Sequence, residues 1–176
     1  MKWMSNARHQ VNAFAVVAAW LLAGLPALAN AGLPAGWRQP LPAEISTPAD
    51  PWRDRDSEAF LRAEGDFDGD GRSDRAELLV SSDGRHFALF VLLGTGRQLR
   101  LLREKISVLP AFGVAKVVPS TFPTACGKGY WECKKGEPSH LSLSRDAIMF
   151  FKRESAASVF VWSASRKAFR RIWVSD

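Results

Sequence analysis

The sequence is poor in the residues from which many catalytic and metal sites are built. Its 176 residues include two cysteines, three histidines and one tyrosine. The cysteines are not spaced as a redox CxxC pair, and the histidines are too scattered to complete a zinc site. A Gly-x-Ser-x-Gly nucleophile elbow and the standard phosphate-binding loops are also absent from the sequence. We therefore predict a protein that is not an enzyme, although a carboxylate pair for glycoside cleavage can form in space without a sequence signal.

Long apolar runs are equally scarce, and the longest lies near the start of the chain. A basic start precedes an uncharged apolar run from Ala13 to Leu25. Ala27-Leu28-Ala29 then supplies small residues where a signal peptidase cuts. We predict a signal peptide over residues 1–29 and a periplasmic or secreted protein that is not attached to the membrane once the peptide is removed. Cleavage after Ala31 and retention of the run as a membrane anchor are the alternatives.

Acidic residues are outnumbered by basic ones, 18 to 24, but many of them gather in one loop. The segment Asp66 to Glu77, DFDGDGRSDRAE, has carboxylates at positions 1, 3, 5, 9 and 12 and glycine at position 6. This spacing predicts a Ca²⁺ loop, because Ca²⁺ takes about six to eight oxygen ligands on a flexible frame. The candidate ligands are oxygen donors of Asp66, Asp68, Asp70, Arg72 (through its carbonyl), Asp74 and Glu77. The alternative is an ordinary acidic turn, in which these carboxylates would repel one another.

The residues after this loop separate two classes of calcium site. An EF-hand has a helix leaving the loop, whereas Leu78-Leu79-Val80 followed by Ser-Ser-Asp-Gly favours a strand and a hairpin. Glu77 is therefore a ligand only if the loop is EF-hand-like. With Gly-Asp-Phe-Asp-Gly-Asp-Gly, an acid and an apolar strand, the loop resembles the FG-GAP/VCBS class. The resemblance implies a five-position site with ligands from Asp66 to Asp74. The motif occurs once, so the propeller of that class is not implied.

A looser resemblance extends over the rest of the chain. The loop, a hairpin ending in Phe-Val-Leu-Leu and an aromatic closing segment, 158–176, look like a group of small exported Gram-negative proteins. Some FG-GAP/VCBS-like periplasmic proteins are immunity partners that block cell-wall-degrading toxins. The resemblance thus implies a protein-binding module, an inhibitor or immunity partner of a cell-wall hydrolase, whose partner is another envelope protein. The alternative function is a calcium-dependent hydrolase acting on an envelope polymer.

The remaining sequence predicts one mainly β domain. Turn residues recur about every ten residues and apolar residues alternate between them, which is typical of antiparallel strands. We expect a proline-rich extended lead-in over residues 30–55 and a β-rich domain over 56–176. A single short helix is expected at Asp56 to Glu64. The expected strands are 76–80, 86–93, 98–102, 114–118, 141–143, 147–152, 158–163 and 169–174.

Two cysteines in an exported chain favour a disulfide between Cys126 and Cys133, within an irregular loop from Thr121 to Ser139. Such a bridge would display Tyr130 and Trp131, which are candidate contacts for a protein partner. Trp162 and Trp173 are expected in the core. The basic residues are scattered, so no nucleic-acid partner is expected. Their densest set, from Arg166 to Arg171, is interpreted as a solvated strand face.

Overall fold

The computed structural model describes residues 32–46, 52–53, 56 and 58–175, so the predicted signal peptide lies outside the described residues. The chain is mainly β and its sheets are antiparallel, as predicted. In chain order the elements are β1 Trp37–Arg38, α1 Pro42–Ile45, β2 Arg62–Gly65, β3 Asp74–Ser81, β4 His86–Leu92, β5 Gln98–Lys105, η1 Ile106–Ala111, β6 Phe112–Val117, β7 Thr121–Pro123, β8 His140–Ser142, β9 Ala147–Lys152, β10 Ala157–Ser163 and β11 Ala168–Ser175.

The first sheet contains β1, β3, β4 and β5 in that order, and β2 pairs with the other half of the β3 edge. The expected hairpin between β3 and β4 is confirmed. Its turn contains Gly84 at φ +68°, a left-handed conformation that glycine adopts without steric cost. Apart from His86, every residue of β4 is buried, so β4 is a central strand covered on both faces.

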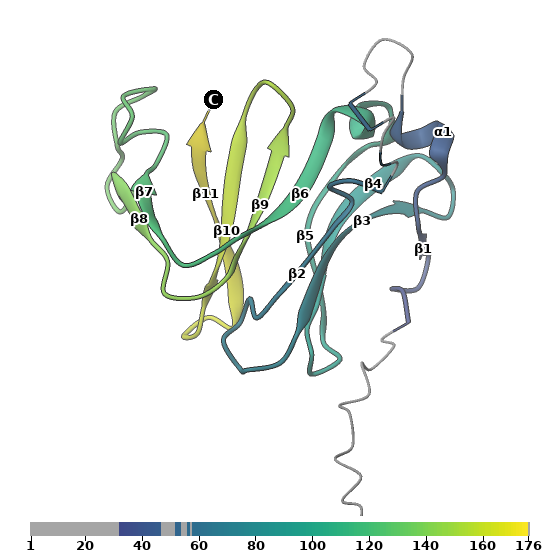
Figure 1. Cartoon of the computed structure of the whole chain (residues 1–176), viewed down its shortest axis with the longest axis horizontal. Coiled ribbons are helices and arrows are strands. Elements are labelled where there is room, and N and C mark those ends of the chain that lie inside the picture. Colours follow the sequence, from purple (N-terminus) through teal and green to yellow (C-terminus); the bar gives the residue numbers. More distant parts are fainter. Residues whose placement is uncertain (1–31, 47–51, 54–55, 57, 176) are drawn as a thin grey trace, which may run out of the picture.

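The second sheet has the order β11-β10-β9-β6 and lies beside the first (Figure 1). β10 and β11, which correspond to the last two expected strands, form a hairpin. A separate two-stranded ribbon of β7 and β8 lies at its outer end. The segment from Thr121 to Ser139 was predicted to be an irregular loop, and this was wrong for its first three residues, which form β7. Residues 121–123 pair with 140–142, and this pairing brings the two ends of the intervening segment together.

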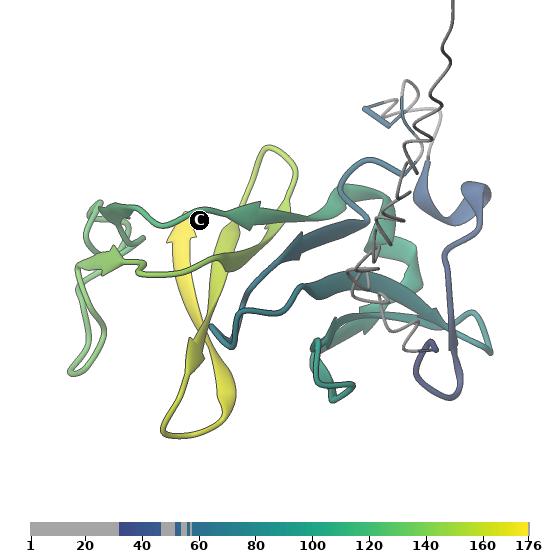
Figure 2. The same ribbon diagram turned by 60° about the horizontal axis from the view of Figure 1, so that its bottom comes forward.

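Both sheets contribute to the main core, and Figure 2 shows the second sheet, green to yellow, to the left of the first. Phe87 and Leu89 of β4 belong to the same buried cluster as Ile148 of β9 and Phe160 of β10. Because side chains alternate along a strand, β9 and β10 also send residues to the opposite face. There, Ala147 and Val159 lie in a second buried cluster with residues of β8 and β11.

The helix expected at residues 56–64 is not formed. Its described residues make a turn and then β2, which pairs with β3. Phe60 has a left-handed backbone, with φ +59°, and its ring stacks on Trp52 with centroids 5.4 Å apart. Strand pairing and aromatic packing thus override a weak local preference for helix. The helix α1 lies instead in the lead-in. No helix among the described residues is long and apolar enough to cross a membrane.

The lead-in is attached to the domain rather than merely extended. β1 adds to β3, and Arg53 is 1% exposed. The Arg53 guanidinium donates to the carbonyl oxygens of Ile45, Ala59, Pro110 and Phe112. Burial lowers the pKa of Arg53 to about 10, so the group remains charged at neutral pH. One arginine thereby joins the lead-in to η1 and β6.

Candidate metal site

The acidic loop joins β2 to β3. Gly65 pairs with Asp74, so residues 66–73 form the turn of a hairpin. Phe67 is fully buried in the main core, while its neighbours in the loop are partly exposed. The alternation of apolar anchor and carboxylate in Asp-Phe-Asp therefore fixes one side chain in the protein and leaves the acids at the surface.

The carboxylates shape the loop by accepting hydrogen bonds from its own backbone. Asp66 accepts from the N–H groups of Gly69 and Gly71, at 2.7 and 2.9 Å. Asp68 accepts from the N–H of Asp70 at 3.1 Å, and Asp70 from that of Arg72 at 2.8 Å. Gly69 and Gly71 both have left-handed backbones, with φ +80° and +83°, which explains the two glycines.

Asp74, at the start of β3, is the centre of this network. It is 2% exposed and accepts three backbone hydrogen bonds. One oxygen accepts from the N–H groups of Phe67 and Asp68, at 2.8 and 3.3 Å, and the other from that of Gly94, at 2.8 Å. Asp74 therefore closes the loop and ties it to the turn between β4 and β5.

Three of the predicted ligands converge. Asp66, Asp68 and Asp74 each offer one carboxylate oxygen, and these oxygens lie within 4.8 Å of one another. Burial raises the pKa of Asp68, and the charges of Asp70 and Asp66 raise it further. Burial raises the pKa of Asp74, with a contribution from Asp68. Neighbouring carboxylates thus disfavour the charged forms of Asp68 and Asp74, and a cation among them would remove that penalty. The triad can hold a metal ion.

Asp70 and Glu77 lie outside this triad. Glu77 is in β3, pairs in register with Arg62 and is 3% exposed. Its carboxylate accepts from the Gln39 side-chain amide at 2.5 Å and lies 3.2 Å from Nε of Arg75. The loop therefore leaves into a strand, which confirms the hairpin arrangement over the EF-hand. Glu77 neutralises Arg75 instead of joining the acidic triad.

Sequence reasoning missed Arg145, which lies between β8 and β9. Its Nη1 donates to the backbone oxygen of Asp68 at 2.5 Å. A Cβ atom at Gly69 would lie 2.2 Å from this nitrogen, so Arg145 is a second reason for glycine there. The guanidinium bonds a carbonyl rather than the Asp68 carboxylate and leaves the acid oxygens to the triad. No local pattern signals this contact, because the residues are 77 positions apart.

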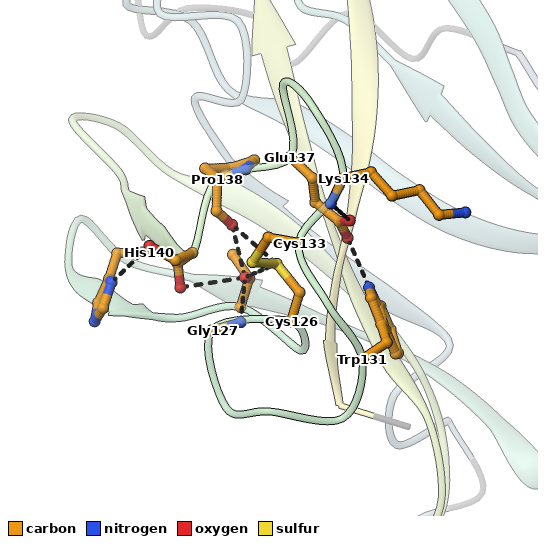
Figure 3. The surroundings of a disulfide bond; sticks show 10 residues. Cys126, Gly127, Trp131, Cys133, Lys134, Glu137, Pro138 and His140 are labelled. Carbon is orange, nitrogen blue, oxygen red and sulfur yellow. Dashed lines mark hydrogen bonds between the residues drawn. A yellow bond between two sulfur atoms is a disulfide. The ribbon is translucent and has the colours of Figure 1, made fainter.

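The disulfide between Cys126 and Cys133 is present, as predicted (Figure 3). A bridge of this kind is compatible with a location outside the cytoplasm. Buried Thr124, which sequence reasoning missed, organises the base of this loop. Its hydroxyl lies 2.7 Å from the Pro138 oxygen and accepts from the N–H of Gly127.

The two aromatic residues inside the ring differ in exposure. The side chain of Tyr130 is 53% exposed. That of Trp131 is half-buried, and its indole N–H donates to Glu137 at 3.1 Å (Figure 3). Trp173, expected in the core, is 38% exposed near this loop, and the backbone of Ala125 donates to its oxygen. The aromatic surface here is therefore made of Tyr130, Trp131 and Trp173.

Comparison of the chain with protein-family models, curated proteins and solved structures returned no match. The resemblance to FG-GAP/VCBS loops therefore depends on the loop residues and stays a prediction.

Proposed function

We propose that this is an exported calcium-binding protein that acts by binding another protein of the cell envelope. The observation that supports the metal is the convergence of three carboxylate oxygens in a loop with calcium-site spacing. The ligands are hard oxygen donors on a glycine-containing turn, which suits Ca²⁺. Mg²⁺ fits less well, because it demands a near-ideal octahedron and keeps several of its waters.

In this proposal the ion is structural. Asp66 and Asp68 belong to the turn, whereas Asp74 opens β3 and bonds the β4–β5 turn. A cation among them would hold the hairpin end in the conformation that Phe67 anchors in the core. Further oxygens would come from Asp70, the carbonyl of Arg72 and water.

A direct binding measurement tests the metal. Titration calorimetry of metal-free protein with Ca²⁺ is expected to show one site, with weaker binding of Mg²⁺. Asp68→Asn should abolish the heat of binding, because it removes a charge from the triad. Glu64→Gln is the matched control, since this exposed acid lies beside the loop in β2 but outside the triad. Equal Ca²⁺ binding by the Asp68→Asn protein would contradict the site.

In this proposal the partner binds at the disulfide loop. Exposed Tyr130 and half-buried Trp131 are side chains of the kind that dominate protein interfaces. Replacing both by alanine should weaken binding of an envelope partner by at least about 2 kcal/mol, roughly 30-fold in the dissociation constant. Val118→Ala is the control, because Val118 is an exposed apolar residue, 57% accessible, outside this loop.

A peptidoglycan zymogram with and without added lysozyme separates binding from catalysis. Suppression of lysozyme by the purified protein would indicate an inhibitor. Clearing by the protein alone, lost on a single substitution outside the acidic loop, would overturn the proposal in favour of a hydrolase.

A further inference from the structure

A groove lies between the disulfide loop and β11. Its volume is about 1250 Å³. One wall is the segment 131–138, which contains the second cysteine, and the other is residues 170–173 of β11. The loop is covalently closed and bonded to β11 at its base, through Ala125 N–H to the Trp173 oxygen and Lys128 Nζ to the Val174 oxygen. The two walls are therefore held at a defined separation.

The β11 wall is an edge strand. β11 is the terminal strand of its sheet and pairs with β10 alone. In an antiparallel strand the N–H and C=O of one residue point to the same side, and successive residues alternate. The Trp173 oxygen points away from β10, toward Ala125. The backbone groups of Arg171 and Phe169, two and four residues earlier, consequently point to the same open side. This edge can accept another strand.

The groove is lined by more basic than acidic side chains. Lys134 and Lys135 come from the loop, and Arg170 and Arg171 come from the strand. None of the four lies within 4.0 Å of a carboxylate among the described residues. The acids that line the groove are Glu132 and Glu137. Glu137 already accepts from the Trp131 indole and from the backbone of Lys134.

Arg171 is held in place rather than mobile in solvent. Its Nε donates to the Ser158 hydroxyl at 2.9 Å, and its guanidinium lies 4.1 Å from the ring centre of Trp173. The remaining guanidinium N–H groups retain their capacity to donate. An ordered cation next to open backbone groups provides both a charge and a register for an incoming chain.

We propose that this groove docks an extended acidic segment of a protein partner, which adds as a strand along the open edge of β11. This inference rests on the proposed protein-binding function and names the chemistry of the partner. The open edge recognises the backbone of the incoming strand, and the four cations that line the groove attract its acidic side chains. A second copy of this chain is disfavoured as the occupant, because two β11 edges would bring like charges together.

The test uses a labelled peptide of alternating glutamate and valine, about ten residues long to match a β-strand. Fluorescence polarisation with the full mature chain should detect binding that weakens on raising salt from about 50 to 200 mM. The same peptide with methylated backbone amides should bind at least about tenfold more weakly, because it has lost its ladder donors. A lysine–valine peptide should not bind. Equal binding of the methylated peptide would overturn strand addition and indicate a purely electrostatic surface.

Two pairs of variants locate the site. Arg171→Pro removes the outward N–H and Arg171→Ala keeps it, so the proline variant should bind more weakly than the alanine variant. Arg170→Glu should abolish binding, whereas Arg97→Glu, an exposed cation in the β4–β5 turn, should leave it unchanged. Thermal melting confirms that each variant is folded. If Arg171→Pro does not fold, the methylated peptide still decides the question. Unchanged binding by the Arg170→Glu protein would contradict the groove.

Failure of this inference is distinguishable from failure of the proposed function. If an envelope partner binds in a manner that depends on Tyr130 and Trp131 but is insensitive to Arg170→Glu and is not displaced by the acidic peptide, only the groove is wrong. If no protein partner binds and the acidic peptide also fails, the proposed function falls as well. Binding of an anionic glycan instead of the peptide would overturn the inference.

Discussion

The acidic loop, residues 66–74, and the disulfide loop, residues 126–133, are held in their conformations by different interactions. Each is organised by one buried polar residue that collects backbone hydrogen bonds, Asp74 in the first and Thr124 in the second. The acidic loop is anchored by fully buried Phe67 and brings like charges together. The disulfide loop is closed by a covalent bond and has Tyr130 facing solvent.

The difference teaches that the two loops respond to different conditions. The proposed cation would relieve the charge repulsion among the carboxylates, so we expect the stability of the acidic loop to depend on the ion concentration. A disulfide acts mainly by restricting the unfolded chain and depends on the redox state of the compartment. We therefore expect the acidic loop to respond to a chelator and the disulfide loop to respond to a reductant.

The largest expected difference between the loops concerns their central side chains. Phe67→Ala should lower the free energy of unfolding by about 3–5 kcal/mol, because it leaves a cavity in the main core. Tyr130→Ala should change it by no more than about 0.5 kcal/mol, as expected for an exposed side chain. Urea unfolding of both variants measures the two changes in the free energy of unfolding. Equal losses would show that the disulfide loop is as integral to the fold as the acidic loop.

Calcium removal should have the next largest effect and should act on the acidic loop. For a dissociation constant of about 10 μM and free Ca²⁺ of about 1 mM, linkage predicts roughly 2.7 kcal/mol of stabilisation. This corresponds to several degrees in the melting temperature of a domain of this size. Thermal unfolding with and without EDTA checks it. Asp70→Ala should remove the calcium-dependent shift and Glu77→Ala should retain it, while an unchanged midpoint for metal-loaded protein would refute the site.

Opening the disulfide should have a slightly smaller effect and should leave the calcium response intact. For so short a ring the chain-entropy estimate is about 2.5 kcal/mol. The Cys126→Ser, Cys133→Ser double variant should therefore melt at a lower temperature, yet show the same shift with EDTA as the parent. Loss of that shift would mean that the loops are coupled. In protein taken from the periplasm, alkylation without reduction should label neither cysteine.

The smallest expected effect is the difference in stability loss between two glycine substitutions in the acidic loop. It distinguishes the cost of backbone conformation from the cost of a lost side-chain contact. Gly71→Ala should cost about 1 kcal/mol, because alanine disfavours the left-handed conformation and a Cβ there meets no neighbour. Gly69→Ala should cost about 1 kcal/mol more, since its Cβ displaces Arg145 from the Asp68 oxygen. In the Arg145→Ala background the two substitutions should lower the free energy of unfolding by equal amounts. A persistent difference would assign the extra cost to some other contact.

Much of the fold could be predicted because it depends on local patterns. Alternating apolar residues located β4, β9, β10 and β11 within a residue or two at each end. The strands that were missed, β1, β2 and β7, are short. β1 and β7 pair with strands distant in sequence, and β2 pairs with β3 across the acidic loop. The expected helix failed for the same reason, because pairing with β3 outweighs a local preference that is worth only tenths of a kcal/mol per residue.

By itself the sequence determined the spacing of the acids, the two glycines that let the loop reverse, and the disulfide pair. These features act over a few residues, where the backbone geometry is nearly fixed by residue type. The tertiary structure decided that Glu77 faces Arg75, that Arg145 holds the loop and that Trp173 borders a groove beside an open strand edge. Each of these requires knowing which distant strands pair, because side-chain contacts across sheets follow from register rather than from neighbouring residues.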